Sequence, residues 1–474
     1  MKTHNNNKLQ NTLSIRNGHL YIEDCDTVEL AAQFGTPLFV VSENHLRENL
    51  RHYQKAFETC WPEGEVRVMP AIKANPTIAV RRVLSEEGAG CDVFGPGELE
   101  CALRGGVAPE MISVNGSIKD HAIIEKAVSI GARIVLDSPT ELEICNQVGE
   151  KLNKKARVML RLKPYLAKLE EKSDFLPQQE IRELTQTIKY GIPTSEVLPM
   201  GPRAMELPFV EPIGVHIHMG RHSKKLSVWC QLIESYVALI KQLSELMNGW
   251  IPKEVDFGGG FASSQDLETR VAVTDYPTPT LEQYAEAITT SFRTAMQQHG
   301  LTTDGIMIEV EPGRGLHNET GLHLTRVHNI KHETINLEHQ WAEVDTSEVF
   351  LGIMGVNPTP PFDYVVANKA DQPSNACFDI VGVTCNAEWL YQQVPVPELE
   401  CGDVIAMLNT GAYIEPMAAN FNALPRPGMV LVSGDQADLI KRHETLDEVF
   451  ARHQVPERLN QPATTPISKE EQVN

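Results

Sequence analysis

The sequence predicts an α/β protein, with a (β/α)8 barrel of the TIM type followed by a second, mainly β domain. Eight strand-like runs alternate with helix-like stretches over roughly 250 residues, which is the pattern of such a barrel. A doubly wound open sheet is the competing arrangement, and the count of eight favours the barrel. After Gly315 the helical periodicity fades and β-rich runs follow, which predicts the second domain.

The strands of the expected barrel are short apolar runs bounded by turn-forming residues. They span Val66–Ile72, Cys91–Phe94, Met111–Val114, Ile134–Leu136, Val158–Leu162, Ile213–Ile217, Val255–Phe257 and Ile306–Val310. The helix-like stretches between them span Ala79–Glu87, Gly97–Arg104, Ala122–Ile130, Pro139–Val148, Val228–Met247 and Leu281–His299. Two polar stretches interrupt the alternation, at residues 165–204 and 265–279, and the longer one is expected to be a loop over one barrel face.

Before the barrel, residues 12–41 predict short strands and turns, and Ser42 is the expected N-cap of a helix. Apolar residues recur behind it at helical spacing and predict one buried face: Leu46, Leu50, Tyr53 and Phe57. We therefore expect the barrel at residues 42–314.

The expected β domain combines residues 12–41 with residues 315–455. Its clearest strands are Leu322–Val327, Cys377–Val383, Val404–Leu408 and Met429–Val432. The polar ends of the chain, residues 1–11 and 461–474, are expected to be disordered.

The composition limits the classes of partner. The chain has 474 residues and a net charge of −21, which argues against non-specific binding to nucleic acid or to an anionic membrane. No apolar run is long enough to span a bilayer. The nine cysteines include no CxxC pair, which fits reduced thiols in a cytoplasmic protein.

Lys73 is the first candidate for chemistry, because it follows an apolar strand that Asn75 and Pro76 then stop. Pro70 lies within the run, so the strand must end irregularly or lose a ladder bond. A lysine there can be an ordinary strand-end residue whose charge reaches solvent. It can instead be a nucleophilic amine, since burial lowers the pKa of an ammonium.

Other strand ends of the barrel carry further candidates, and each has an ordinary reading. Asp92 could cap a helix, and Glu311 could pair with Arg314. The run Gly258, Gly259, Gly260 could be a tight turn or could bind a phosphate through its exposed backbone N–H groups. His216 and His218, with His222, could bind a metal, but such histidines are more often hydrogen-bonded and no fitting fourth ligand is evident, so no metal is expected.

Because the carboxyl ends of barrel strands meet at one face, these residues are expected to converge. A lysine for a Schiff base, glycines for a phosphate, a histidine to lie against a ring and a carboxylate for a pyridinium nitrogen are the parts that pyridoxal 5'-phosphate (PLP) requires.

The chain resembles the barrel-type PLP-dependent decarboxylases of the alanine racemase-like fold, which include diaminopimelate, ornithine and arginine decarboxylases. The resemblance covers about residues 35–450 and is strongest to the diaminopimelate decarboxylase-like branch. The motifs recur in the family's order: Ala71-Ile72-Lys73-Ala74-Asn75; Cys91-Asp92-Val93 with Gly97-Glu98-Leu99; Lys189-Tyr190-Gly191-Ile192; His216-Ile217-His218-Met219-Gly220; Asp256-Phe257-Gly258-Gly259-Gly260; Glu311-Pro312-Gly313-Arg314; Cys385; and Gly411-Ala412-Tyr413.

This resemblance implies a role for each matching residue. Lys73 would hold the cofactor, with Asp92 supporting the site beside it. His218 would stack on the ring, and Glu311 would hold the pyridinium proton. The groups around the phosphate or the substrate carboxylate would be Gly258, Gly259, Gly260, Gly313, Arg314 and Tyr413.

The resemblance also implies a homodimer with shared active sites, in which Cys385 enters from the second subunit and helps to return a proton. A glutamate at the pyridinium nitrogen favours decarboxylation, whereas an arginine there, as in alanine racemase, would suppress it. A racemase or other PLP lyase, and a catalytically silent homologue that regulates a partner enzyme, remain as alternatives.

Three departures from the family bear on the substrate. Asn386 stands where the family has an acid that binds a distal amino group, and the next carboxylate is Glu388. The segment 345–354 lacks the arginine that binds a distal carboxylate. Arg221 replaces a serine and could meet a phosphate or a substrate carboxylate. These changes favour an amino acid or an amino-acid conjugate, as in siderophore-like secondary biosynthesis, with diaminopimelate or another diamino acid as the alternative.

Overall fold

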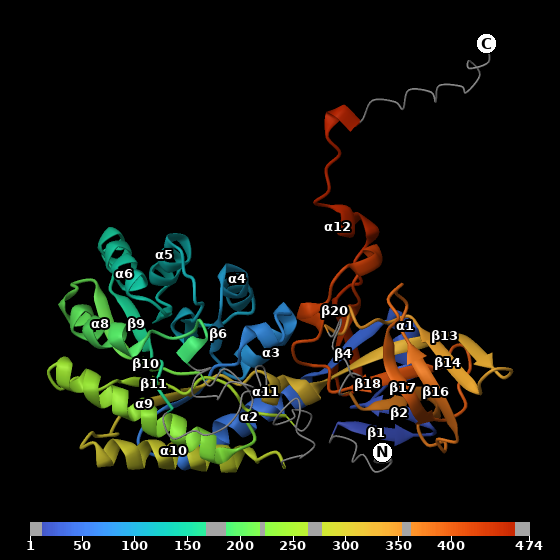
Figure 1. Cartoon of the computed structure of the whole chain (residues 1–474), viewed down its shortest axis with the longest axis horizontal. Coiled ribbons are helices and arrows are strands. Elements are labelled where there is room, and N and C mark those ends of the chain that lie inside the picture. The colour runs from blue at the N-terminus through green and yellow to red at the C-terminus, as the bar shows by residue number, and fades with distance from the viewer. Residues whose placement is uncertain (1–11, 167–185, 219–222, 264–276, 353–361, 460–474) are drawn as a thin grey trace.

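The computed structural model describes residues 12–166, 186–218, 223–263, 277–352 and 362–459. It contains an eight-stranded parallel sheet that curls into a nearly closed barrel, and a separate nine-stranded sheet that is mostly antiparallel (Figure 1). A three-stranded sheet near the N-terminus packs its apolar residues against the nine-stranded one. This arrangement confirms the predicted fold class.

The barrel strands run in the order β5-β12-β11-β10-β9-β8-β7-β6. Their bounds are β5 Val66–Val68, β6 Cys91–Val93, β7 Ile112–Val114, β8 Arg133–Leu136, β9 Ala156–Arg161, β10 Val210–His216, β11 Glu254–Asp256 and β12 Met307–Val310. The seam between β5 and β6 is held by two local contacts. Gly90 N–H donates to the Val68 carbonyl at 3.2 Å, and Ala71 forms an isolated parallel bridge with Asp92.

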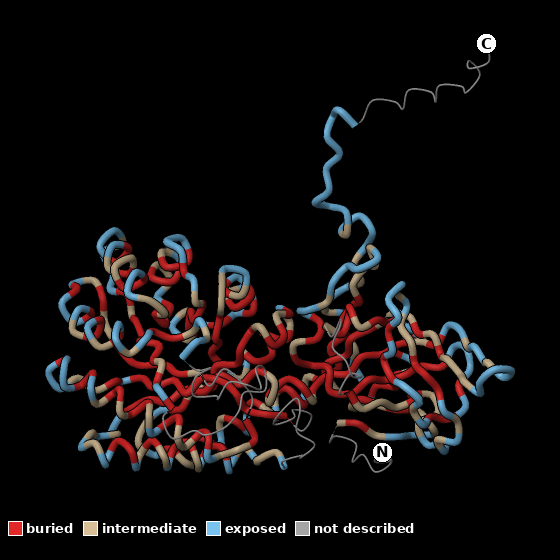
Figure 2. Tube along the Cα trace, in the orientation of Figure 1, coloured by how far each residue is buried: buried red, intermediate tan, exposed pale blue. Residues whose placement is uncertain are grey.

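Helices surround the barrel and turn their apolar faces toward it. They are α2 Glu43–Cys60, α3 Ile78–Glu86, α4 Pro96–Arg104, α5 His121–Ile130, α6 Pro139–Leu152, α8 Thr194–Glu206, α9 Leu226–Leu246, α10 Leu281–Gln298 and the short α11 Arg314–His317, with 3-10 turns η1 Ile72–Ala74, η2 Pro109–Met111 and η3 Asn318–Thr320. Ser42 caps α2 as predicted, because its hydroxyl accepts from His45 N–H at 3.1 Å. Figure 2 shows that the buried residues follow the strands and the inner faces of these helices.

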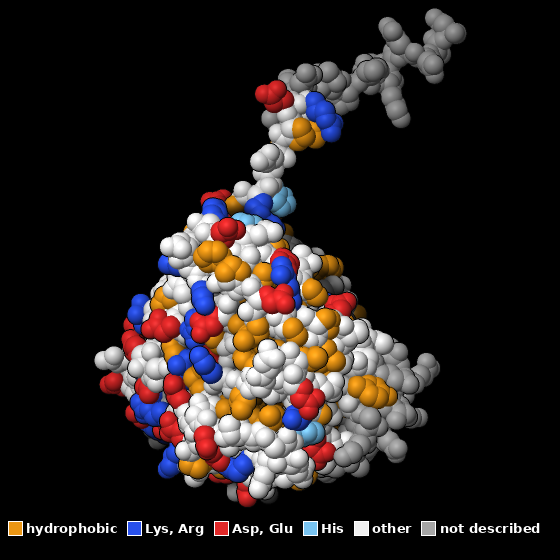
Figure 3. Space-filling view, turned by 90° about the vertical axis from the view of Figure 1, so that its left-hand side faces the viewer, with side chains coloured by type: hydrophobic (Ala, Val, Ile, Leu, Met, Phe, Trp, Pro, Cys, Tyr) orange, Lys and Arg blue, Asp and Glu red, His pale blue; other side chains and the backbone are white. Residues whose placement is uncertain are grey.

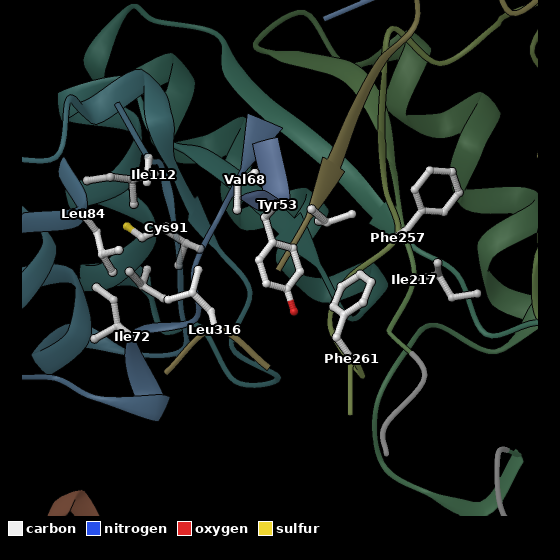
Figure 4. Packing of buried hydrophobic residues seen from close by; sticks show 14 of the residues in the cluster. Tyr53, Val68, Ile72, Leu84, Cys91, Ile112, Ile217, Phe257, Phe261 and Leu316 are labelled. Carbon is white, nitrogen blue, oxygen red and sulfur yellow. The ribbon is translucent and has the colours of Figure 1, made fainter. Parts of the chain in front are cut away.

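An aromatic cluster anchors the chain just past the glycine run. Phe261 stacks on Trp229 with ring centroids 5.3 Å apart and meets Tyr53 edge-on at 5.4 Å. Figure 4 shows Tyr53 and Phe261 next to each other among the buried hydrophobic residues, which include Val68 of β5 and Phe257. This packing fixes the backbone that follows β11.

The second domain is built from both ends of the chain. The N-terminal part supplies β1 Leu13–Arg16, β2 His19–Ile22, β3 Cys25–Asp26, α1 Thr27–Phe34 and β4 Leu38–Ser42. The C-terminal part supplies β13 Gly321–Glu333, β14 His339–Val344, β15 Tyr364–Val366, β16 Ala376–Val381, β17 Trp389–Val396, β18 Val404–Leu408, β19 Gly428–Ser433, β20 Gln436–Lys441 and α12 Leu446–Phe450, with η4 Ala367–Lys369, η5 Glu415–Met417, η6 Phe421–Ala423 and η7 Glu457–Leu459. Strand β4 lies between β13 and β19, so the two ends of the chain form one sheet.

The structure corrects two expectations in the barrel. The first strand ends at Val68 rather than Ile72, because Pro70 has no N–H for the ladder, and Lys73 lies on the turn η1. The end of the expected 165–204 loop is the helix α8, although it contains Pro199 and Pro202. The buried residues of α8 recur at helical spacing, which outweighs the prolines as a signal: Val197, Met200, Gly201 and Ala204.

Other expectations were wrong or fall on residues outside the description. Residues 27–34 were expected to be strand or turn and form helix α1, which Asp26 caps through the Val28 N–H at 2.8 Å. Residues 1–11, 167–185, 264–276 and 460–474 lie outside the described residues. Within the described ranges, none of the helices combines the length and the apolar character needed to cross a bilayer. All nine cysteines are free thiols.

Candidate active site

Lys73 reaches a cavity at the carboxyl ends of the barrel strands. Turn η1 carries it, directly after the Ala71 bridge to β6, and its Nζ donates to Asp92 Oδ2 at 2.5 Å. The Lys73 side chain is 36% exposed, whereas that of Asp92 is 2% exposed. The irregular end of β5 therefore turns the ammonium toward a buried carboxylate on the neighbouring strand, and Asp92 caps no helix.

The charges around Lys73 decide its protonation. Burial lowers the pKa of Lys73, but the negative charges of Asp92, Tyr413 and Glu311 outweigh burial and raise that pKa above its ordinary value. Burial and the charge of Glu311 raise the pKa of Asp92, and Lys73 opposes them. The expectation that burial lowers the pKa of Lys73 is therefore wrong for this arrangement. Lys73 and Asp92 titrate as a coupled pair.

Glu311 is held from below by neutral and basic neighbours. The Asn115 side-chain amide donates a short hydrogen bond to Glu311 Oε1, and Ser113 Oγ donates to Asn115 Oδ1 at 2.7 Å. His216 Nε2 lies 3.5 Å from the same Glu311 oxygen. Burial raises the pKa of Glu311, but the charges of His216 and Lys73 hold it well below its ordinary value. Glu311 is thus kept as a carboxylate, and its partners are not those expected, since it does not pair with Arg314.

Asp256 completes a buried group with His216 and Glu311, whose ligand-type atoms all lie within 4.8 Å of one another. Burial and the charges of Glu311 and Glu309 raise the pKa of Asp256 well above its ordinary value, and Gly258 N–H donates to its Oδ1 at 2.7 Å. A protonated Asp256 is a poor metal ligand, so the group is better described as an ionised Glu311 beside a protonated Asp256. Burial, followed by the charge of Lys73, lowers the pKa of His218 well below its ordinary value, which leaves a neutral ring.

The glycines near the cavity are required by close backbone approach. A Cβ at Gly259 would lie 2.6 Å from the Glu311 carbonyl oxygen, and a Cβ at Gly313 would overlap the Tyr413 hydroxyl. Gly258 and Gly260 have φ of +65° and +115°, where other residues are strained. The run therefore lines the cavity with backbone.

Tyr413 brings the β domain to the barrel. Its N–H donates to the Ala74 carbonyl, one residue past Lys73, at 2.8 Å, and its φ is +61°. The guanidinium carbon of Arg314 lies 5.1 Å from the centre of the Tyr413 ring. Both domains consequently contribute to one site.

The cavity has a volume of about 180 Å³ and joins most of the predicted cofactor residues. Its described lining is Ala71, Lys73, His218, Gly259, Gly260, Phe261, Glu311, Gly313, Arg314 and Tyr413. These residues fit PLP: the set holds one amine, one buried carboxylate, a neutral ring and a glycine cradle. Asp92 also has a buried oxygen, Oδ1, with no hydrogen-bond partner within the described ranges.

A larger hollow of about 630 Å³ lies between α2, β5 and the residues before β6. Two of its arginines form ion pairs with carboxylates of the same lining, Arg51–Glu87 and Arg67–Glu65, both at 2.7 Å. The smaller cavity is the one that holds the predicted cofactor residues.

Of the predicted β-domain residues, Tyr413 lines this cavity, whereas Cys385, Asn386 and Glu388 are absent from its described lining. Cys385 is exposed, and its Sγ accepts from Asn422 Nδ2 at 3.4 Å. Asn386 donates to Glu348, and Glu388 is 4% exposed. The Glu388 carboxylate accepts from Ser347 Oγ, Glu348 N–H and Thr384 at 2.7–2.9 Å, so it joins two loops rather than facing solvent. Arg221 and His222 lie outside the described residues.

Sequence reasoning missed two residues of the site. Asn115 was overlooked because it lies one residue past β7 in a segment with no charge or glycine run, and Phe261 was overlooked because it resembles any core aromatic. A search of every strand end for amides and for the residue after the glycines would have found both.

Comparison with known proteins gives a match that covers the barrel and most of the residues that line the cavity. The family model described as pyridoxal-dependent decarboxylase, pyridoxal binding domain, matches residues 43–318. The chain is 30% identical over 450 residues to a diaminopimelate decarboxylase of Archaeoglobus fulgidus, covering 94% of this chain and 99% of the relative. It is 30% identical over 443 residues to that of Methanothermobacter thermautotrophicus, covering 93% and 97%.

A solved crystal structure has a similar three-dimensional fold. The crystal structure of diaminopimelate decarboxylase from M. jannaschii in complex with L-lysine matches with a TM-score of 0.82 at 27% identity. The match covers 95% of this chain and 99% of that chain, so it includes both domains.

Replacing Asp92 by Asn should lower the pKa of Lys73, because the nearest negative charge is removed while burial remains. In the unmodified chain the raised pKa means that the pair stabilises the fold below about pH 10 and loses this contribution at higher pH. NMR titration of 13C-methylated lysines, with Lys73 assigned through Lys73→Arg, measures the shift. The exposed Asp304→Asn is the matched control, and an unchanged Lys73 titration in Asp92→Asn would contradict the assignment.

Proposed function

The chain belongs to the pyridoxal-dependent decarboxylases, and from that premise we propose that it removes the α-carboxylate of a diamino acid such as diaminopimelate as CO2. The observation that carries this proposal is the placement of Lys73 beside Asp92 and Glu311 in one glycine-lined cavity. The enzyme is a PLP-dependent carboxy-lyase that acts on an amino acid.

Each part of the cofactor has a partner in the cavity. Lys73 would hold its aldehyde carbon, Glu311 its ring nitrogen, and the backbone of Gly259 and Gly260 with Arg314 its phosphate. The bound cofactor supplies an electron sink for the pair of electrons left when CO2 departs.

The protein's own task is to keep protons where this chemistry needs them. Asn115 and His216 keep Glu311 ionised, so Glu311 can hold a proton on the ring nitrogen opposite it. The Asp92 carboxylate stabilises the protonated Lys73 amine. Lys73 can then donate a proton to the α-carbon after CO2 leaves. This arrangement supports decarboxylation over racemisation, because the carboxylate favours full delocalisation into the ring.

The β-domain loops offer a carboxylate for the far end of the substrate. Asn386 donates to Glu348 Oε1, and the buried Glu388 fixes the Glu348 backbone N–H at 2.8 Å. Glu348 is half-buried, and its side-chain partner among the described residues is the neutral amide of Asn386. It therefore offers a fixed negative charge one hydrogen bond away from the position where the family has its acid, which supports a substrate with a distal ammonium.

A second candidate is an amino acid or conjugate without a distal charge, as in siderophore-like biosynthesis. Asn386 itself and the lack of an arginine at residues 345–354 favour it. A substrate panel separates the two candidates.

We further propose that the enzyme is a cytoplasmic homodimer with shared sites. Cys385 is exposed on a loop of the β domain and is absent from the described lining of its own cavity. Its thiol would therefore act in the cavity of a second copy of the chain. The nine free thiols support a reducing compartment.

Lys73→Ala should abolish CO2 release and the visible absorbance of the lysine-bound cofactor, since no other described amine lines the cavity. Absorbance spectra of protein supplied with PLP measure the second effect, with Lys369→Ala as a control lysine variant. If the spectrum of Lys73→Ala matches that of the unchanged enzyme, Lys73 is not the cofactor-bearing residue.

Glu348→Gln should raise KM for meso-diaminopimelate about tenfold or more with a smaller effect on kcat, because a charge-assisted contact is lost. CO2 release from diaminopimelate, lysine, ornithine, arginine and uncharged analogues is measured in parallel. Glu398→Gln, an exposed carboxylate elsewhere in the β domain, should leave KM unchanged. A wild-type preference for substrates without a distal amino group, with no effect of Glu348→Gln, would favour the second candidate.

Mixed Lys73→Ala and Cys385→Ala subunits should regain roughly a quarter of wild-type activity, because half of the dimers are hybrids with one intact site of two. Activity is followed against the measured rate of subunit exchange. No recovery after complete exchange would refute the shared site.

A further inference from the structure

The barrel sheet is joined between β5 and β6 only toward the carboxyl ends of these strands. Gly90 N–H donates to the Val68 carbonyl, and Ala71 bridges to Asp92 beyond it. Nearer the amino ends, no ladder bond joins the two strands within the described ranges. The hollow of about 630 Å³ lies at this gap, and we name it the seam hollow. Its lining comes from α2 with Trp61, from residues 64–68, from residues 87–89 and from Met111.

The edge of β5 that faces the seam hollow carries two backbone N–H groups without an acceptor. In the parallel ladder with β12, the bonds are made by the residues on either side of Val66 and Val68, so the N–H groups of these two valines point toward the hollow. Neither N–H has an acceptor among the described residues. Val66 and Val68 are 6% and 2% exposed. A buried N–H without an acceptor costs free energy, so each of them favours an acceptor that enters the hollow.

The carbonyl groups of the same two valines already have donors. Gln54 Nε2 donates to the Val66 carbonyl at 2.9 Å, and Gly90 N–H donates to that of Val68 at 3.2 Å. At Val66 and Val68, this edge of β5 therefore offers donors only. An extended peptide would satisfy both valine N–H groups but leave its own N–H groups on that side without acceptors. A carboxylate brings acceptors and needs none.

The charged side chains of the seam hollow leave one cation unpaired. The carboxylates of its lining each have a donor at 2.7 Å, in the pairs Arg51–Glu87, Arg67–Glu65 and Gln54–Glu58. The Lys55 side chain also lines the hollow and has no hydrogen-bond or ion-pair partner within the described part of the chain. Figure 3, which faces the barrel side of the molecule, shows basic side chains interspersed with acidic ones. The local donors therefore select the ligand, and they favour an anion.

The spacing of the two backbone donors sets the shape of the ligand. Val66 and Val68 are two residues apart on one strand, so their N–H groups are about 6.6 Å apart. An extended aliphatic dicarboxylate of six or seven carbons separates its carboxyl groups by about 6–8 Å. Its methylene chain would lie along the apolar lining of the hollow, which includes Leu50, Trp61 and Met111.

We propose that the seam hollow binds a linear aliphatic dicarboxylate of six or seven carbons, with one carboxylate at the Val66 N–H and the other at the Val68 N–H. Lys55 supplies a charge-assisted contact. The site lies outside the cavity of Lys73, but its ligand contacts the strand that leads into the turn of that lysine. The inference does not rest on the proposed function, because it uses residues that the reaction does not need.

The first test titrates pimelate, the seven-carbon dicarboxylate, into the full-length, PLP-loaded protein labelled with 15N-valine. The amide resonances of Val66 and Val68, assigned with Val66→Ile and Val68→Ile, should shift downfield and saturate, because each N–H gains an acceptor. The amide of Val148, buried in α6, should not shift. Cadaverine, which has the same chain length but an ammonium at each end, should shift none of these resonances. Unmoved Val66 and Val68 amides at the solubility limit of pimelate, or equal shifts with cadaverine, overturn the inference.

The second test measures the pimelate dissociation constant from the Val68 amide shift. Lys55→Ala should raise this constant about tenfold, because a charge-assisted contact is lost. Lys126→Ala, at an exposed lysine of α5, is the matched control and should leave the constant unchanged. An unchanged constant in Lys55→Ala overturns the inference. So does a peptide of alternating valine and glutamate that shifts the two amides when pimelate does not. Neither test measures CO2 release, so failure of the seam hollow and failure of the proposed function are distinguishable.

Discussion

The ion pair between Lys73 and Asp92 at the seam of the barrel is the interaction on which the site depends. Pro70 ends the ladder of β5 early, and the bridge from Ala71 to Asp92 then joins the two edge strands. Lys73 follows on a short turn and has a buried carboxylate within 2.5 Å. The same few residues therefore close the barrel between β5 and β6 and position the Lys73 amine.

A second layer below this pair controls the carboxylates. Glu311 is held by Asn115 and His216, and the same strand ends bring Asp256 close by. Several negative groups in so small a buried volume cannot all be ionised at once, so the neighbours decide which of them keeps its charge. Here the basic and amide partners favour an ionised Glu311, while Asp256 accepts from the Gly258 N–H and is repelled by the charges of Glu311 and Glu309.

Much of the fold was predictable, because apolar periodicity reports which face of an element is buried. The barrel strands and most of its helices follow from that pattern alone. The misses have a local cause: α1 is a short helix in a segment read as strand, and α8 carries two prolines. In the site, the charged residues and glycines at strand ends were predicted correctly as neighbours of the cavity. Burying a charge or ordering a glycine costs free energy, so such residues at a strand end indicate a function. Asn115 was not predicted, because a neutral amide carries no signal of function in the sequence. Its role follows from the hydrogen bond that it donates to Glu311 in the structure. The contact of Asn386 with Glu348 joins residues 38 positions apart and needed the structure.

The central position of β4 has a consequence for synthesis on the ribosome. Phe39 of β4 pairs with Met429 of β19, so its partner strand is made 390 residues later. At about 5–20 residues per second, the apolar strand Leu38–Ser42 waits roughly 20–80 seconds after its own translation before that partner exists. The barrel can close in the meantime, whereas the β domain cannot be completed until the last strands emerge. During this interval the apolar strand β4 lacks one of its two neighbours in the sheet and stays accessible to chaperones.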